Sequence, residues 1–229
     1  MSQVTLNIIA ISVFSVTMLI LLGPLIHVSP EGLATVVAVL AGAVTLDQVG
    51  WGGRGGGLLV DAISQRSPEY RDRIARHEAG HFLAAHLLDI PVASYTLTAW
   101  ETLRAGLDGS GGVVFDTAEI DRAMAVGTIT QQQLDRYCTV WMAGIAAEEL
   151  TYGSAQGGQD DRLKLNLLWQ QISRPLQEVP LKQRWSVLQA KTLLEKEQAA
   201  YNSLVEALEN RRSVEECRQL IEQHRGSAV

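Results

Sequence analysis

Residues 67–91 read SPEYRDRIARHEAGHFLAAHLLDIP and contain the most informative pattern in the chain. The opening Ser-Pro is typical of a helix start, with serine as the N-cap and proline in the first turn. The closing Ile-Pro is typical of a helix end, because the residue before a proline is disfavoured in helical geometry. The stretch therefore predicts a helix in which His77 and His81, four residues apart, share one face.

Two imidazoles at this spacing can bind one metal ion, and zinc is the usual ion of an HExxH pattern on a helix. Glu78 lies on the flank of the same face, where its carboxylate can take a proton from a water that the metal makes more acidic. The chain has only five histidines, so chance seldom produces this pattern. A helix with two structural histidines and a surface glutamate is the weaker interpretation.

The third metal ligand separates the classes of zinc peptidase. One class has glycine and histidine three and six residues after the second motif histidine, where this chain has Ala84 and Leu87. A second class takes a glutamate about twenty residues on. Glu101 lies at that distance, but it ends a strand-like run, so we do not expect it to bind. His86 is rotated away from the metal-facing side of the helix.

Two later segments carry a resemblance to a known family. Residues 143–153 read AGIAAEELTYG, and residues 157–161 read GGQDD. HEAGH, followed at this distance by GxAAEExxxG and a glycine-led aspartate, resembles the peptidase domain of FtsH-type, AAA-associated zinc metalloproteases over roughly residues 68–224. The resemblance also implies that residues 112–115 are an edge strand that can pair with an extended substrate backbone.

The resemblance assigns roles to single residues. It implies a Zn²⁺ ion held by His77, His81 and Asp161, with Asp160 as the close alternative to Asp161. It also implies that Glu78 is the catalytic general base.

Two adjacent glutamates, Glu148 and Glu149, lie on the helix that is expected to pack against the HEAGH helix. A carboxylate there can accept the free ring N–H of a ligand histidine and fix its orientation. The alternative is that one or both face solvent, and Glu148 is slightly favoured for the inward position.

Residues 4–28 and 33–49 are two apolar stretches, and Glu31 is the only charged residue among the first 46. The first stretch has the ~20 apolar residues that a membrane span needs. The second is short, so a re-entrant or interfacial helix is its alternative. A cleaved signal peptide is disfavoured because the N-terminus has no lysine or arginine. We expect a transmembrane hairpin in residues 1–50 and a multi-pass integral membrane protein. Arginines follow the hairpin, which places the rest of the chain on the cytoplasmic or stromal side.

Residues 51–66 are rich in glycine and predict a flexible linker. Residues 67–229 form the predicted metallopeptidase domain, with strands at 92–100 and 112–115. Further helices are expected at 130–152, 163–178, 181–210 and 213–224. The predicted fold class is mainly α with a small β-sheet: an FtsH-like zinc peptidase domain attached to an N-terminal transmembrane hairpin.

The chain departs from the FtsH-type pattern in the region between the spans and the peptidase. The AAA ATPase module that normally lies there is replaced by the glycine-rich segment, and no GxxxxGK[ST] sequence occurs. After Asp161, the usual apolar-x-x-Ala-Thr becomes Arg-Leu-Lys-Leu-Asn. Any proteolysis is therefore expected to be limited to loose or exposed segments unless an ATPase partner supplies the unfolding work.

The net charge of -6 argues against a nucleic-acid-binding surface. We predict a membrane-anchored zinc metalloendopeptidase that hydrolyses peptide bonds of membrane or membrane-proximal proteins with no ATPase of its own. The expected partners are polypeptide substrates and the lipid bilayer, and also further copies of the chain or an ATPase-bearing FtsH-type subunit. The alternatives are a non-catalytic membrane adaptor or assembly partner of FtsH-type complexes, and a zinc hydrolase with a non-peptide substrate.

Overall fold

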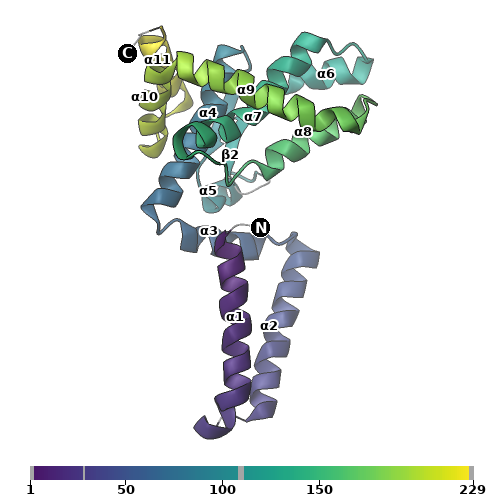
Figure 1. Ribbon diagram of the computed structural model, residues 1–229, viewed down its shortest axis with the longest axis vertical. Helices are drawn as coiled ribbons and strands as arrows, with labels where there is room; N and C mark the ends of the chain where they lie inside the picture. The colour runs from purple at the N-terminus through teal and green to yellow at the C-terminus, as the bar shows by residue number, and fades with distance from the viewer. Residues whose placement is uncertain (1–2, 28, 108–110, 227–229) are drawn as a thin grey trace.

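The computed structural model describes residues 3–27, 29–107 and 111–226, and it is mainly helical with a two-stranded sheet (Figure 1). This confirms the predicted class of a mainly α protein with a small β-sheet. In chain order the elements are α1 Gln3–Leu22, the 3₁₀ helix η1 Gly23–Ile26, α2 Pro30–Trp51, α3 Arg54–Ser64, α4 Pro68–Leu87, β1 Val92–Thr96, α5 Ala99–Arg104, β2 Gly112–Phe115, α6 Ala118–Val126, α7 Gln131–Tyr152, α8 Gln159–Gln171, the 3₁₀ helix η2 Leu176–Glu178, α9 Val179–Lys196, α10 Gln198–Glu209 and α11 Val214–His224.

Helices α1 and α2 form a hairpin that projects from the rest of the chain (Figure 1). Only α2 is long and apolar enough to cross a membrane among the described residues, none of its residues is buried, and an N-terminal signal sequence would show the same properties. The sequence favoured the first stretch as the clearer span. That emphasis was wrong, and so was the expectation of a multi-pass protein, because among the described residues α2 alone has the length and hydropathy of a span. Helix α1 ends at Leu22 before the η1 turn, whereas Ser29 caps an α2 that continues to Trp51.

Residues 54–64 form helix α3, where the sequence predicted a flexible linker. The two carboxylate oxygens of Asp47 accept hydrogen bonds from the backbone N–H groups of Gly55 and Gly56, each at 2.8 Å. These bonds satisfy donors that the first turn of a helix leaves without partners, which offsets the poor helix propensity of glycine. The division of the chain into residues 1–50, 51–66 and 67–229 stays a prediction.

The centre of the folded domain is the contact between α4 and α7. Helix α9 also packs on α7, and α10 packs on α4. Small residues allow a close approach between the two central helices: a Cβ on Gly80 would lie 2.6 Å from the carbonyl oxygen of Ala143. The C-terminal helices thus close the core of this domain.

Strands β1 and β2 are antiparallel, with Tyr95 opposite Val113 and Thr96 opposite Gly112. The predicted strand at 92–100 was too long, because Thr98 caps a short helix, α5, through its side-chain oxygen. The capping box of Thr130 and Gln133 at the start of α7 is as expected.

Two helix predictions differ from the structure. The predicted helix 163–178 is replaced by α8 and η2, and the predicted helix 181–210 is two helices that meet at Glu197. Helix α6 was not anticipated.

Candidate metal centre

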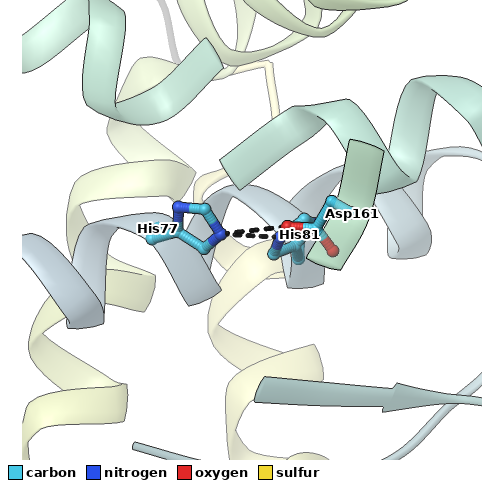
Figure 2. A group of neighbouring side chains, drawn as sticks. All are labelled: His77, His81 and Asp161. Atoms are coloured by element: carbon cyan, nitrogen blue, oxygen red, sulfur yellow. Dashed lines mark hydrogen bonds and ion pairs between the residues drawn. The ribbon is translucent and has the colours of Figure 1, made fainter. Parts of the chain in front are cut away.

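Helix α4 places His77 and His81 with their Nε2 atoms 3.0 Å apart (Figure 2). Its N-cap is Ser67, as the sequence predicted. Asp161, in the first turn of α8, brings its Oδ2 to 3.3 Å from the Nε2 atom of each histidine. All three side chains are buried, and one ligand atom from each lies within 4.8 Å of the others.

The glycine-led turn before α8 decides which aspartate faces the histidines. Gly158 has φ +83°, and a Cβ there would lie 2.3 Å from a side-chain carbon of Ile145. The turn therefore requires glycine, both for its backbone conformation and for its contact with α7. With this turn, Asp161 is buried beside the histidines while Asp160 is exposed.

The donor set fits a zinc ion. Two imidazole nitrogens and a carboxylate oxygen are ligands of catalytic zinc sites, and three atoms about 2.0–2.2 Å from one ion in tetrahedral geometry lie roughly 3.3 Å apart. The distances of 3.0, 3.3 and 3.3 Å among His77, His81 and Asp161 match this spacing. Gly144 on α7 keeps the place open, because a Cβ there would lie 2.4 Å from Nε2 of His77 and 2.5 Å from Nε2 of His81.

The second nitrogen of each histidine has its own partner. His81 Nδ1 lies 2.7 Å from the carbonyl oxygen of Val140, and His77 Nδ1 lies 2.8 Å from Oε1 of Glu148. Because a carbonyl and a carboxylate only accept hydrogen bonds, both Nδ1 atoms carry the proton. The Nε2 atoms are therefore the ones that face the shared position, where a metal ion would replace any proton that they carry.

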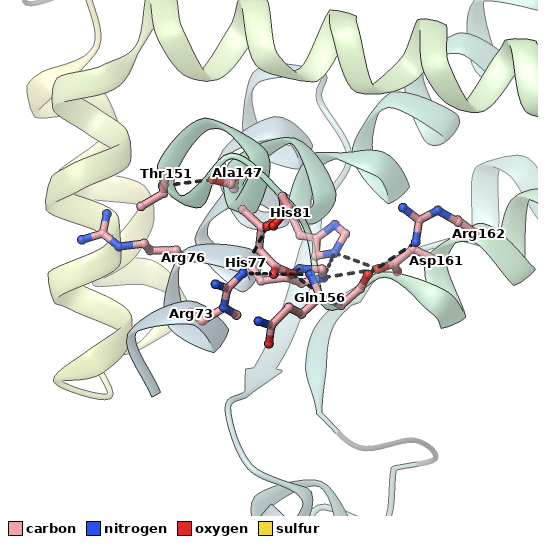
Figure 3. A network of polar contacts seen from close by, with 12 residues as sticks. Arg73, Arg76, His77, His81, Ala147, Thr151, Gln156, Asp161 and Arg162 are labelled. Carbon is pink, nitrogen blue, oxygen red and sulfur yellow. Dashed lines mark hydrogen bonds and ion pairs between the residues drawn. The ribbon is translucent and has the colours of Figure 1, made fainter. Parts of the chain in front are cut away.

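Figure 3 shows the network of polar contacts around His77, His81 and Asp161. Glu148, which binds His77, is buried. It also accepts hydrogen bonds from Arg73 Nη1 at 2.8 Å, the backbone N–H of Gln156 at 2.8 Å and that of Gly157 at 3.1 Å. Burial alone would raise the pKa of Glu148, but these bonds and the one from His77 lower it to about 2. A charged carboxylate thus holds the first histidine in place.

The structure decides between the two adjacent glutamates. Glu149 points outward and pairs with Lys191 at 2.8 Å, where it is partly exposed. Glu148 is therefore the one that orients a histidine, in agreement with the slight preference from the sequence.

Negative charge dominates this site. Burial alone would lower the pKa of His77, whereas hydrogen bonds to Asp161 and Glu148 raise it to about 10. Burial would likewise raise the pKa of Asp161, but the charge of His81 and hydrogen bonds to His77 and His81 hold it well below its usual value. The position between these groups therefore favours a cation.

Glu78 is buried one residue after His77, and its Oε2 accepts a hydrogen bond from the backbone N–H of Val113 at 2.9 Å. Strand β2 thus lies directly beside the HExxH helix. The proposed general base is fixed to the strand that the sequence expected at an edge.

Lys164 lies beside the site. In the sequence it was noted only as part of a departure from the family pattern. Its Nζ lies 3.0 Å from Oδ1 of Asp161, the oxygen that is turned away from the histidines. Because Asp161 and Lys164 are three residues apart on α8, their spacing could have predicted this contact. Arg73 was missed in the same way, although it lies four residues before His77 on α4.

Glu101 and His86 lie outside the cluster, as expected. Glu101 is on helix α5 and not at the end of a strand, so the stated reason was wrong. Its carboxylate accepts hydrogen bonds from the Leu97 N–H and from Arg211. His86 pairs with Glu222 at 2.6 Å.

Comparisons with known proteins place this geometry in context. No family model matches the chain. A stretch of 95 residues, 42% of this chain, is 35% identical to the "ATP-dependent zinc metalloprotease FtsH 1" of Sorangium cellulosum (strain So ce56), and it covers 14% of that protein. The chain therefore matches only a small part of this relative. The comparison confirms the resemblance to an FtsH zinc metalloprotease, and the buried group of His77, His81 and Asp161 is consistent with an HExxH zinc peptidase site.

Proposed function

We propose that this chain is a membrane-anchored zinc metalloendopeptidase that cleaves membrane or membrane-proximal proteins. The observation that carries the proposal is the buried convergence of His77, His81 and Asp161 on one position, with Glu78 beside it. Two histidines and an acidic residue on a helix pair are suited to a zinc ion, and the adjacent carboxylate is suited to proton transfer.

A bound zinc ion supplies Lewis acidity toward a water and toward the scissile carbonyl. Glu78 supplies the proton transfer. Since Oε2 of Glu78 is bound to the Val113 N–H, Oε1 is the oxygen that takes the proton from the attacking water and delivers it to the leaving amine. Glu148 and the Val140 carbonyl keep both imidazoles oriented throughout.

The position of strand β2 favours a peptide as the substrate. It pairs with β1 on one side, and the Val113 N–H points from β2 to Glu78 on α4. An extended polypeptide added along this edge would lie beside the general base and the metal position. Recognition through backbone hydrogen bonds is tolerant of sequence.

The membrane part of the proposal rests on the apolar helix α2. We propose that α2 anchors the chain in the bilayer, with the metal centre on the cytoplasmic or stromal side, where the basic residues follow. Zn²⁺ is the proposed cofactor, and further copies of the chain or an ATPase-bearing FtsH-type subunit are the proposed protein partners.

The test is cleavage of casein, a loosely folded protein, by the zinc-loaded full chain in detergent and without ATP. We expect internal peptide bonds to be cut, with products mapped by mass spectrometry. A chelator should stop the reaction, and added zinc should restore it. Cleavage of small esters or amides without any cleavage of casein would instead support a hydrolase with a non-peptide substrate.

A further inference from the structure

The polar and apolar faces of helix α3 are reversed relative to those of a helix on the surface of a soluble protein. Its polar side chains bind the folded domain: Asp61 accepts a hydrogen bond from the Ala99 N–H at 2.9 Å, and Gln65, directly after the helix, donates to the Leu97 carbonyl at 3.1 Å. Ser64 is buried. Soluble surface helices normally turn their polar residues outward and their apolar residues toward the core.

The outward face of α3 is apolar. Leu59 is 68% exposed and Ile63 is 49% exposed, and Ala62 lies exposed beside them. Spacings of three and four residues put them on one side of the helix, and we call them the α3 stripe. Leucine and isoleucine side chains are stabilised by removal from water. The stripe is therefore suited to an apolar environment.

The position of α3 along the chain identifies that environment. Helix α2 has 22 residues, which at 1.5 Å per residue span about 33 Å, close to the ~30 Å hydrocarbon core of a bilayer. Trp51, at the end of α2, is exposed, and tryptophan is enriched at the membrane–water interface. Helix α3 begins three residues later.

The junction between α2 and α3 is fixed by hydrogen bonds. Asp47, in the last turns of α2, binds the first N–H groups of α3, and α3 lies across the end of the hairpin, between it and the folded domain (Figure 1). If α2 spans the bilayer, α3 must lie at the level of the lipid headgroups.

We infer that α3 is an interfacial helix, whose stripe of Leu59, Ala62 and Ile63 lies in the boundary between lipid headgroups and acyl chains. The inference rests on the proposed anchoring of the chain through α2. Asp61 and Gln65 attach the folded domain to α3, so the metal centre is held at a fixed height above the membrane. The substrate is then a polypeptide segment that emerges from the bilayer or lies close to it.

Nitroxide labels on single introduced cysteines test this in the full chain, reconstituted in vesicles of phosphatidylcholine with some phosphatidylglycerol. The labelled variants are Leu59→Cys and Ile63→Cys. The native Cys138 and Cys217 are buried, and burial raises their pKa values to about 12 and about 11, so they stay unlabelled in the folded protein. Collisions with oxygen report lipid exposure, and collisions with a water-soluble nickel chelate report water exposure.

Two matched positions calibrate the measurement. Val39→Cys is an exposed position in the middle of α2, and Leu188→Cys is an exposed position on α9 of the folded domain. Zinc content of each labelled variant confirms that the domain is folded. We expect the nickel-to-oxygen collision ratio at positions 59 and 63 to be about tenfold lower than at 188, at a shallower depth than at 39.

Water exposure at 59 and 63, equal to that at 188, would overturn the inference. If position 39 were still in lipid, the membrane anchor itself would stand, whereas water exposure at 39 as well would refute both. Labels at 59 and 63 that are shielded from both reagents would show that a protein covers the stripe, and would also overturn the inference.

Discussion

Helices α2 and α4 begin with the same three residues, Ser-Pro-Glu, and have similar lengths of 22 and 20 residues. In each, the serine side chain accepts a backbone N–H from the residue three positions on. Beyond this start their surroundings differ: α4 is buried from His77 to Ala85, while no described residue of α2 is.

The comparison shows that capping fixes where a helix begins, while the pattern inside the helix decides which medium it requires. Helix α4 has charged residues toward its start and a run of small and apolar residues around the histidines, so it can pack closely against α7. Helix α2 has no charged residue between Glu31 and Asp47, and in the described part of the chain it packs closely only against α1 and α3. The following predictions test this contrast, from the largest expected effect to the smallest.

Gly144→Ala should abolish zinc binding, because its Cβ would occupy space beside the Nε2 atoms of His77 and His81. Overpacking of this kind typically costs 1–3 kcal/mol even where no metal is involved. The matched control is Gly42→Ala in α2, where no described atom outside the adjacent residues and the helix's own backbone lies within 4 Å of the new Cβ. Zinc content after purification is the measurement, and a Gly144→Ala variant with full zinc occupancy would contradict the assigned metal position.

Val39→Lys should weaken membrane insertion, because a lysine at the centre of a span costs about 2.5–3.5 kcal/mol. Val39 lies near the middle of α2 and is exposed. The same change at Leu188, an exposed residue of α9, should have no effect. Resistance of the chain to alkaline extraction from membranes is the readout. Equal resistance of both variants would show that α2 is not in contact with lipid.

Glu148→Gln should lower zinc affinity by about 10–100-fold, the usual effect of removing a partner that orients a ligand histidine. The amide loses the charge that pairs with Arg73 and places N–H groups opposite backbone donors. Glu149→Gln, one residue on at the surface, should leave zinc affinity unchanged. Competition with a chromogenic chelator measures both. Similar affinities in the two variants would exclude the positioning role of Glu148.

Lys164→Met should lower zinc affinity by no more than about fivefold, because a partly exposed ion pair is worth at most ~1 kcal/mol. Its ammonium group binds the outer oxygen of Asp161. Lys164→Arg, which keeps the charge, should restore the native affinity. A loss as large as that of Glu148→Gln would mean that Lys164 controls the position of Asp161 far more strongly than its exposure implies.

Features that depend on neighbouring residues could be predicted from the sequence. The start of α4, the capping box of α7 and the shared face of His77 and His81 follow from spacings of three or four residues. Asp161 could be named only through the resemblance, because it lies 84 residues from His77. The roles of these residues remain predictions.

Features that depend on distant contacts could not be predicted. Helix α3 forms because Asp47, eight residues earlier, satisfies its first N–H groups. The helical run is interrupted between α9 and α10 at Glu197. This residue is buried, and its carboxylate accepts a hydrogen bond from the N–H of Gly226 near the C-terminus. The partner of His81 is the carbonyl of Val140. Neither side-chain pattern nor composition reports such contacts.

The most direct test of the zinc peptidase assignment is a comparison of the native chain with Glu78→Gln. Both are purified in detergent, loaded with zinc and incubated with casein in the absence of ATP. We expect both to retain zinc, and the variant to cleave about 10²–10⁴-fold more slowly, as loss of a general base predicts. Equal cleavage by both would show that Glu78 is not the base. No cleavage by either, with zinc bound, would contradict the peptidase and support a non-catalytic adaptor.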